Sequence, residues 1–184
     1  MPEAFADNIM AVAAQVSSKG RFVIGCDIIE ADKLSNRLVS LLPRQIDLRT
    51  ANALRLGLRE LLINAVEHGC LEIGFDLKTE ISESKDYLEF LLERQKQPEY
   101  RTRKVQVEYD IRAARIVFRI TDDGKGFDLS RMESRDAGKG GFGLLGISER
   151  VKMLGGSQEI ESEIGGGTTI LIKIPIPNAG KSVG

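Results

Sequence analysis

Two pairs of alternating segments constrain the fold of this chain most strongly. Residues 104–111 (KVQVEYDI) and 115–122 (RIVFRITD) alternate apolar and polar side chains on either side of a short turn, a pattern typical of a β-hairpin. Residues 157–164 and 168–176 predict a second hairpin, which is connected through the three glycines at 165–167. The second half of the chain is therefore expected to form antiparallel strands.

The first half of the chain shows helical spacing instead. Asp47 offers an N-cap for a long helix that runs to about Gly69. Residues 21–29 (RFVIGCDII) are β-rich and short enough for one more strand. The segments whose apolar residues recur at helical spacing, or that carry helix-ending signals, are 3–17, 31–42, 48–69, 86–96 and 144–154. We expect an α+β fold: a two-layer α/β sandwich with a mixed, mostly antiparallel sheet covered on one face by helices.

The chain has the length of one domain. We expect an N-terminal helix within residues 1–20, which could serve as a dimer contact or as a link to another module. The domain itself would span residues 21–176, with a short tail at 177–184. Within the domain, residues 71–104 are polar enough to form a peripheral insertion.

Composition excludes several classes of protein. The net charge of −1 offers no field that would attract nucleic acid. No apolar run approaches the ~20 residues that cross a bilayer, and the first residues lack the basic region of a signal peptide. We therefore expect a cytoplasmic domain with no membrane span in this chain. Cys26 and Cys70 fit no metal or redox spacing and are expected to be buried free thiols, while the single histidine, His68, excludes most zinc sites.

The long helix presents a polar stripe. Glu60, Asn64 and His68 follow one another at i+4 steps, and the small residues Ala53 and Gly57 continue the stripe and leave space beside it. A carboxylate and an amide one turn apart could bind a hard cation and activate a hydroxyl group. A solvated polar face is the alternative, since surface helices normally carry one.

A second candidate lies at the end of a predicted strand. Asp122 follows RIVFRIT directly and precedes Gly124 and Gly126. A carboxylate held at a strand end can accept a hydrogen bond from an exocyclic amine, and glycines allow a flat ring to approach the backbone. An ordinary Asp-Gly turn is the alternative.

Two glycine-rich stretches complete the candidates. Gly141, Gly143 and Gly146 form a literal G-x-G-x-x-G, but no strand precedes it, as a dinucleotide-binding turn requires. The stretch opens a helix, so free N–H groups near Gly143 and Leu144 could bind phosphate, with Lys139 adding positive charge. A glycine loop without a ligand is the alternative. In the last predicted hairpin, the hydroxyl of Thr168 could reach the same ligand, and a plain hairpin turn is the alternative.

Together, these four motifs resemble the conserved boxes of the Bergerat-fold (GHKL) superfamily, which comprises gyrase, Hsp90-type chaperones, sensor histidine kinases and MutL-like proteins. The resemblance covers about residues 20–176. Its elements, in chain order, are Glu60-x-x-x-Asn64, Asp122-x-Gly124-x-Gly126, Gly141-x-Gly143 and Gly165-x-Gly167-Thr168. The glycines at 141 and 143 then correspond to the hinge of an ATP lid at about residues 128–143.

The resemblance implies ATP and Mg²⁺ as ligands and a role for each matching residue. Asp122 would accept the adenine 6-amino group, with Gly126 leaving room for the base. Asn64 would coordinate Mg²⁺ and Glu60 would act as the general base. Lys139 and the N–H groups near Gly143 would hold the phosphates, with Thr168 supporting the site and Arg131 and Arg135 as further candidates. For His68, a structural role at the helix end and a nucleotide contact both stay open.

Two branches of the superfamily compete. The segment RELLINAVEHG and the strand and helix before it resemble anti-sigma-factor serine kinases, whereas residues 140–176 resemble the C-terminal half of sensor histidine kinases. Our leading hypothesis is a serine/threonine kinase that phosphorylates a small regulator protein resembling an anti-sigma antagonist, or that binds a sigma factor. The alternatives are the catalytic domain of a sensor histidine kinase, within a larger multidomain signalling protein or a homodimer, and a nucleotide-sensing module without useful catalysis.

Overall fold

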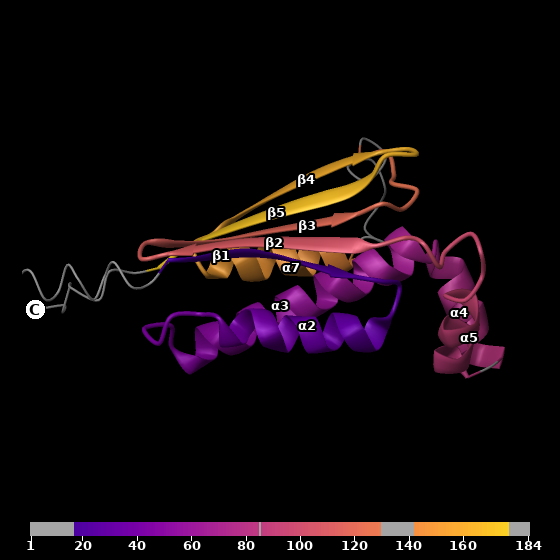
Figure 1. The fold of residues 1–184 in the computed structure, drawn as a ribbon, viewed down its shortest axis with the longest axis horizontal. Coiled ribbons are helices and arrows are strands. Elements are labelled where there is room, and N and C mark those ends of the chain that lie inside the picture. The colour runs from indigo at the N-terminus through magenta and orange to yellow at the C-terminus, as the bar shows by residue number, and fades with distance from the viewer. Residues whose placement is uncertain (1–16, 85, 130–141, 177–184) are drawn as a thin grey trace, which may run out of the picture.

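A five-stranded antiparallel sheet forms one layer of the molecule (Figure 1). The computed structural model describes residues 17–84, 86–129 and 142–176. The spatial order is β1-β2-β3-β5-β4, and each neighbouring pair is antiparallel. The strands are β1 Ser18–Ile24, β2 Val105–Arg112, β3 Arg115–Asp122, β4 Ser157–Glu163 and β5 Gly167–Pro175.

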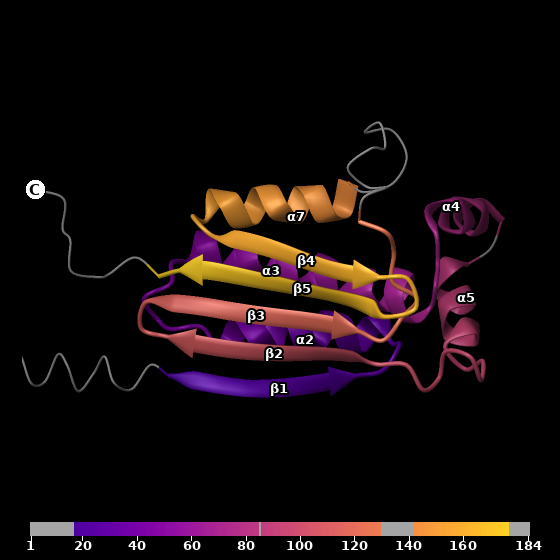
Figure 2. The same ribbon diagram turned by 90° about the horizontal axis from the view of Figure 1, so that it is seen from above.

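Helices form the second layer, on one face of this sheet (Figure 1). Three of them, α2 Ile28–Ser40, α3 Leu48–Asn64 and α7 Phe142–Met153, lie beneath the strands. Two more, α4 Phe75–Ser84 and α5 Tyr87–Arg94, lie beyond the ends of the strands (Figure 2). The predicted two-layer α+β fold is therefore confirmed.

The two hairpins follow the predicted alternation. Arg112 pairs with Arg115, which leaves Ala113 and Ala114 as a two-residue turn. In β3, Ile116, Phe118 and Ile120 are buried toward the helices, while the side chains between them are less buried. Burial of every second residue fixes the register, because a shift by one residue would turn the whole apolar set to the other face.

The apolar stripe predicted for the long helix forms the centre of the core. Leu54, Leu58, Leu61, Leu62 and Ala65 are all buried in one cluster with the inward side chains of the sheet. Asp47 caps α3 as predicted, because its Oδ1 accepts a hydrogen bond of 2.9 Å from the Thr50 N–H. The helix is regular only to Asn64, however.

Beyond Asn64 the chain continues as a π-helical segment, η1 Ala65–Cys70. The Leu71 N–H donates to the Val66 carbonyl five residues earlier, at 2.8 Å. The sequence predicted one uninterrupted helix to Gly69, and the wider turn at its end was not foreseen. Turns of this kind are rare and often occur at functional sites.

The prediction for the first strand was wrong in its boundaries. The strand covers Ser18–Ile24 rather than residues 21–29, and Gly20 lies inside it against the Tyr109 ring. Ile29 belongs to α2 because the Asp27 side chain accepts its N–H at 2.7 Å and caps the helix there. A side-chain cap thus overrode the β propensity of the isoleucines that follow it.

Of the remaining predictions from the sequence, the one for the cysteines is confirmed, and one helix was missed. Cys26 and Cys70 are buried and free, as predicted. Helix α4 was missed, because its sequence FDLKTEISES is largely polar.

The expected N-terminal helix, the tail and most of the expected lid lie outside the described residues. Within the described part of the chain, no helix combines the length and apolar character needed to span a membrane.

Candidate functional site

The predicted site centres on Asp122, the last residue of β3. Its side chain lies in the interior, with only 5% of the residue exposed. Burial raises the pKa of the Asp122 carboxyl to about 6, against the opposing effect of hydrogen bonds from the Gly124 and Thr168 N–H groups. The bond from Gly124 to Oδ1 measures 3.0 Å. A carboxyl group that is buried at the end of a strand and ionises near neutral pH is typical of a functional site.

Glycines allow three elements to meet around this carboxyl group. A Cβ atom on Gly69 of η1 would lie 2.5 Å from the Asp122 Cγ, and a Cβ on Gly124 would overlap the Gly69 carbonyl. Gly126 has a left-handed backbone with φ of 61° and packs against the Glu163 carbonyl at the end of β4. Side chains at the first two positions would push η1 away from the strand that carries Asp122.

Gly69 is a residue of the site that was not predicted from the sequence. A glycine after a predicted helix is already explained as a helix stop, so the sequence offered no reason to give it a second role. The signal that could have found it is its place directly after the polar stripe of Glu60, Asn64 and His68.

Thr168 lies beside Asp122 because these residues pair across β3 and β5. Its hydroxyl is 3.0 Å from the Ser162 Oγ on β4. Ser162 also donates to the Gly167 carbonyl at 3.1 Å and accepts from the Phe127 N–H at 2.9 Å. Ser162 thereby ties the turn after Asp122 to the last hairpin, a role that the sequence analysis did not assign.

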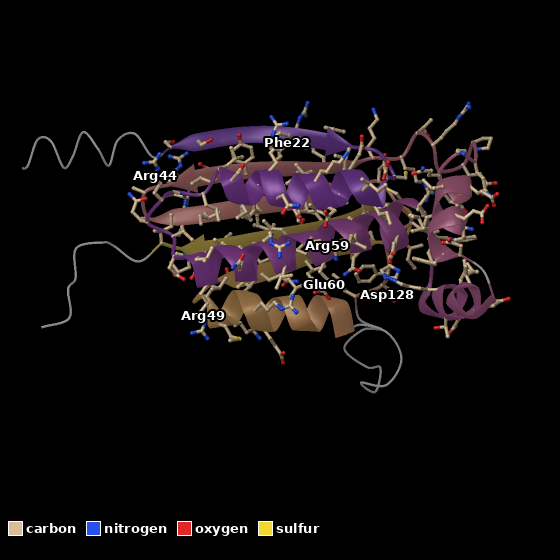
Figure 3. The ribbon with its side chains drawn as sticks, turned by 90° about the horizontal axis from the view of Figure 1, so that it is seen from below. Phe22, Arg44, Arg49, Arg59, Glu60 and Asp128 are labelled. Atoms are coloured by element: carbon tan, nitrogen blue, oxygen red, sulfur yellow. The ribbon has the colours of Figure 1, made fainter. Side chains whose placement is uncertain are left out.

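Glu60 and Asn64 lie on α3, one helical turn apart, and both are half-buried. The Glu60 Oε2 accepts a hydrogen bond of 3.2 Å from the Arg150 Nη1 of α7. Figure 3 shows Glu60 between α3 and α7, on the face away from the sheet. Arg150 was not predicted as a site residue.

The space expected beside the polar stripe is present. A Cβ on Gly57 would meet no atom within 4 Å, and Ala53 and Gly57 line a shallow hollow between α3 and α7. The hollow continues over Ile147 and Arg150 of α7. Glu60 itself does not line this hollow, and Arg150, which does, is its hydrogen-bond partner.

His68 is exposed, and its Nδ1 donates a hydrogen bond to the Ile73 carbonyl. This contact closes the chain just after η1, and it provides a physical basis for the structural role considered for His68. A nucleotide contact by the same ring stays a prediction.

Two further predicted residues lie at the start of α7. Gly143 and Leu144 occupy its first turn, where backbone N–H groups have no partner within the helix. Lys139, Gly141, Arg131 and Arg135 lie outside the described residues. No group of three or more acidic, histidine or cysteine side chains that could hold a metal occurs in the described part of the chain. Asn64 fits a Mg²⁺ ion that takes its other ligands from phosphate and water.

Comparison with known proteins identifies the family. Residues 50–178 match the family described as histidine kinase-, DNA gyrase B-, and HSP90-like ATPase. The match covers more than half of the chain, so the chain belongs to this family of ATPases.

Individual relatives are histidine kinases. The signal transduction histidine-protein kinase/phosphatase DegS of Bacillus subtilis is 42% identical over 73 residues, which are 40% of this chain and 18% of DegS. An uncharacterized sensor-like histidine kinase of Chloroflexus aurantiacus is 47% identical over 57 residues, or 31% of this chain and 10% of that protein. The chain therefore spans less than a fifth of the length of these relatives. They favour the histidine-kinase alternative over our leading hypothesis of a serine kinase, which they do not support.

Among solved structures, the histidine kinase domain from the blue-light activated histidine kinase of Erythrobacter litoralis EL346 is similar to this chain. It aligns over 80% of this chain and 58% of that one, with 17% sequence identity and a TM-score of 0.48.

The raised pKa of Asp122 predicts how stability depends on pH. The folded protein binds this proton more tightly than the unfolded chain, whose Asp pKa is near 3.8. The contribution of Asp122 to stability is thus fully present below pH ~4 and is lost as pH rises through about 6. Relative to Asp122→Asn, the wild type should lose on the order of 2–3 kcal/mol between these limits. Urea unfolding of both proteins at several pH values measures this difference, and a flat difference would contradict the assignment.

The contact between Gly69 and Asp122 predicts opposite effects for two Gly→Ala substitutions in helical segments. Gly57→Ala should stabilise the fold by roughly 0.5–1 kcal/mol, because alanine favours helix and the site is open. Gly69→Ala gains the same propensity but should destabilise by about 1–3 kcal/mol, because its methyl group overlaps the Asp122 carboxyl. Thermal unfolding compares the two variants. Equal behaviour would show that η1 does not press against Asp122.

Proposed function

We propose that this chain is the ATP-binding catalytic domain of a signalling histidine kinase. The observation that carries the proposal is the Asp122 carboxyl, buried at the end of β3 where Gly69, Gly124 and Thr168 meet. Membership of the ATPase family and the two histidine-kinase relatives support it. The downstream partner would be a response regulator, with dimerisation of the kinase as a further expectation.

In this proposal Asp122 selects the purine. Its carboxylate accepts the hydrogen bond of the adenine 6-amino group. The glycine-rich turn from Gly124 to Gly126 lets the flat base approach the backbone. Thr168, on the neighbouring strand, faces the same space and limits where the base can lie.

Asn64 and Glu60 act at the phosphate end of the substrate. Asn64 offers an amide oxygen to Mg²⁺, which when bound neutralises charge on the phosphates. Glu60 takes the role of general base or orienting group for the acceptor, and Arg150 fixes the direction of its side chain through the 3.2 Å bond. The N–H groups of Gly143 and Leu144, with Lys139, are assigned to the phosphate tail.

The phosphoacceptor lies outside these residues in this proposal. His68 is the only histidine of the 184 residues, and it is engaged with the Ile73 carbonyl within the site itself. The acceptor histidine must therefore come from another segment or another chain in this proposal.

Asp122→Asn tests the adenine assignment. An amide presents a donor where the base also presents a donor, so affinity for a non-hydrolysable ATP analogue should fall roughly 10- to 100-fold in calorimetry. Asp123→Asn is the matched control. The Asp123 carboxylate accepts the Lys104 N–H at 2.7 Å, and an asparagine oxygen can do the same. Wild-type affinity in Asp122→Asn would refute adenine selection by this residue.

Glu60→Gln tests the catalytic assignment. Loss of a general base should reduce phosphoryl transfer by about 10²-fold or more while the affinity for the ATP analogue is kept. The measurement is transfer of labelled γ-phosphate by the full-length kinase that contains this chain. An acid-labile, base-stable product identifies phosphohistidine, whereas an acid-stable, base-labile product would return the assignment to the serine-kinase hypothesis. Unchanged transfer would remove Glu60 from the mechanism.

A further inference from the structure

Two arginines of the segment 71–104 donate hydrogen bonds to backbone carbonyls at the end of η1 and just after it. Arg94, the last residue of α5, donates from Nε to the Leu71 carbonyl at 2.6 Å. Arg103, two residues before β2, donates from Nη1 to the Cys70 carbonyl at 2.9 Å and, more weakly, to the Gly69 carbonyl at 3.5 Å. These carbonyls lie at the end of a helical segment, where they have no partner further along the helix. The two guanidinium groups therefore satisfy the backbone that forms one wall around Asp122.

A buried tyrosine holds both arginines in place. Tyr100 contacts both, with the Arg94 and Arg103 guanidinium carbons 4.6 Å and 5.3 Å from the centre of its ring. Its hydroxyl accepts from the Arg94 Nη2 at 2.8 Å. Planar guanidinium groups stack well on aromatic rings, and their donors are then fixed in direction.

Arg103 is also connected, through Glu72, to Lys125 in the turn after Asp122. Its Nη2 donates to the Glu72 Oε1 at 2.7 Å, and the other oxygen of Glu72 lies 3.6 Å from the Lys125 Nζ. Glu72 has a left-handed backbone with φ of 51°, which is uncommon for a residue other than glycine. The ion pairs thus hold a strained residue between η1 and the glycine-rich turn.

The same backbone touches Asp122 on its opposite side. The Gly69 Cα packs against the Asp122 carboxyl, and Gly124 packs against the Gly69 carbonyl. A continuous set of contacts therefore runs from Arg103 through Gly69 to the atoms assigned to the base. A movement of Arg103 would change where Gly69 lies, and with it the space and the donors around Asp122.

We propose that Arg103 is a positioning residue for the adenine site, and that the segment 71–104 sets the selectivity for the base through it. This inference rests on the proposed function. The segment is then a part of the nucleotide site, which it reaches through backbone carbonyls without touching the substrate itself.

Arg103→Ala should weaken binding of a non-hydrolysable ATP analogue roughly tenfold, the effect of losing about one charged hydrogen bond. Binding of inorganic triphosphate with Mg²⁺ should stay unchanged, because those contacts are assigned to Asn64 and the start of α7. The preference for the adenine over the guanine analogue should fall by a similar factor. Arg103→Lys should recover only part of the preference. A lysine ammonium group lacks the two separate nitrogens with which the guanidinium group donates to the Cys70 carbonyl and to the Glu72 carboxylate.

Arg101→Ala is the control, because Arg101 is exposed and lies in the same loop. Its affinities should match those of the wild type. Competition calorimetry gives the adenine-to-guanine ratio, and thermal unfolding gives the stability of each variant. If Arg103→Ala does not fold, Arg103→Lys alone decides the question through the ratio.

The outcomes separate the two proposals. If the wild type prefers adenine and the Arg103 variants lose stability but keep that preference, the positioning role is wrong and the proposed function stands. If the wild type shows no preference for adenine nucleotides, the proposed function itself fails. A reduced preference in folded Arg103 variants, with unchanged binding of triphosphate, supports the positioning role.

Discussion

The contact between the Asp122 carboxyl and the backbone of Gly69 is the constraint on which the rest of the site depends. A carboxyl group removed from water requires hydrogen-bond donors and resists ionisation. Here the Gly124 and Thr168 N–H groups supply those donors, and burial still raises the pKa to about 6. On its other side the carboxyl is packed by η1, and only a glycine at position 69 permits η1 to approach β3 so closely.

The contact between Gly69 and Asp122 occurs in the π-helical segment, where the backbone departs from the regular α-helix. The Leu71 N–H bonds to the carbonyl of Val66 instead of following the regular pattern, so the end of the long helix is wider than an α-helical turn. The same segment holds Glu67, which is buried and paired with Lys78 of α4 at 2.6 Å. The irregular turn is thus tied on one side to the sheet and on the other to the segment 71–104.

That segment illustrates how composition can mislead about location. Its polar sequence indicated a peripheral insertion, and α4 and α5 do lie beyond the ends of the strands (Figure 2). Yet Arg94 and Arg103 reach back to the carbonyls of Leu71 and Cys70. The charge that marked the segment as solvated instead satisfies backbone groups beside the candidate site.

The sequence by itself determined the two hairpins, the buried face of α3 and the candidate residues Glu60, Asn64, Asp122 and Thr168, because period, turn residues and strand ends are local signals. It did not determine the start of α2, where the Asp27 cap prevailed over β propensity. Only the tertiary structure decided the partners of Gly69, Arg103 and Arg150. Each meets residues more than 30 positions away, and the physical fit between such segments leaves no periodic trace in the chain.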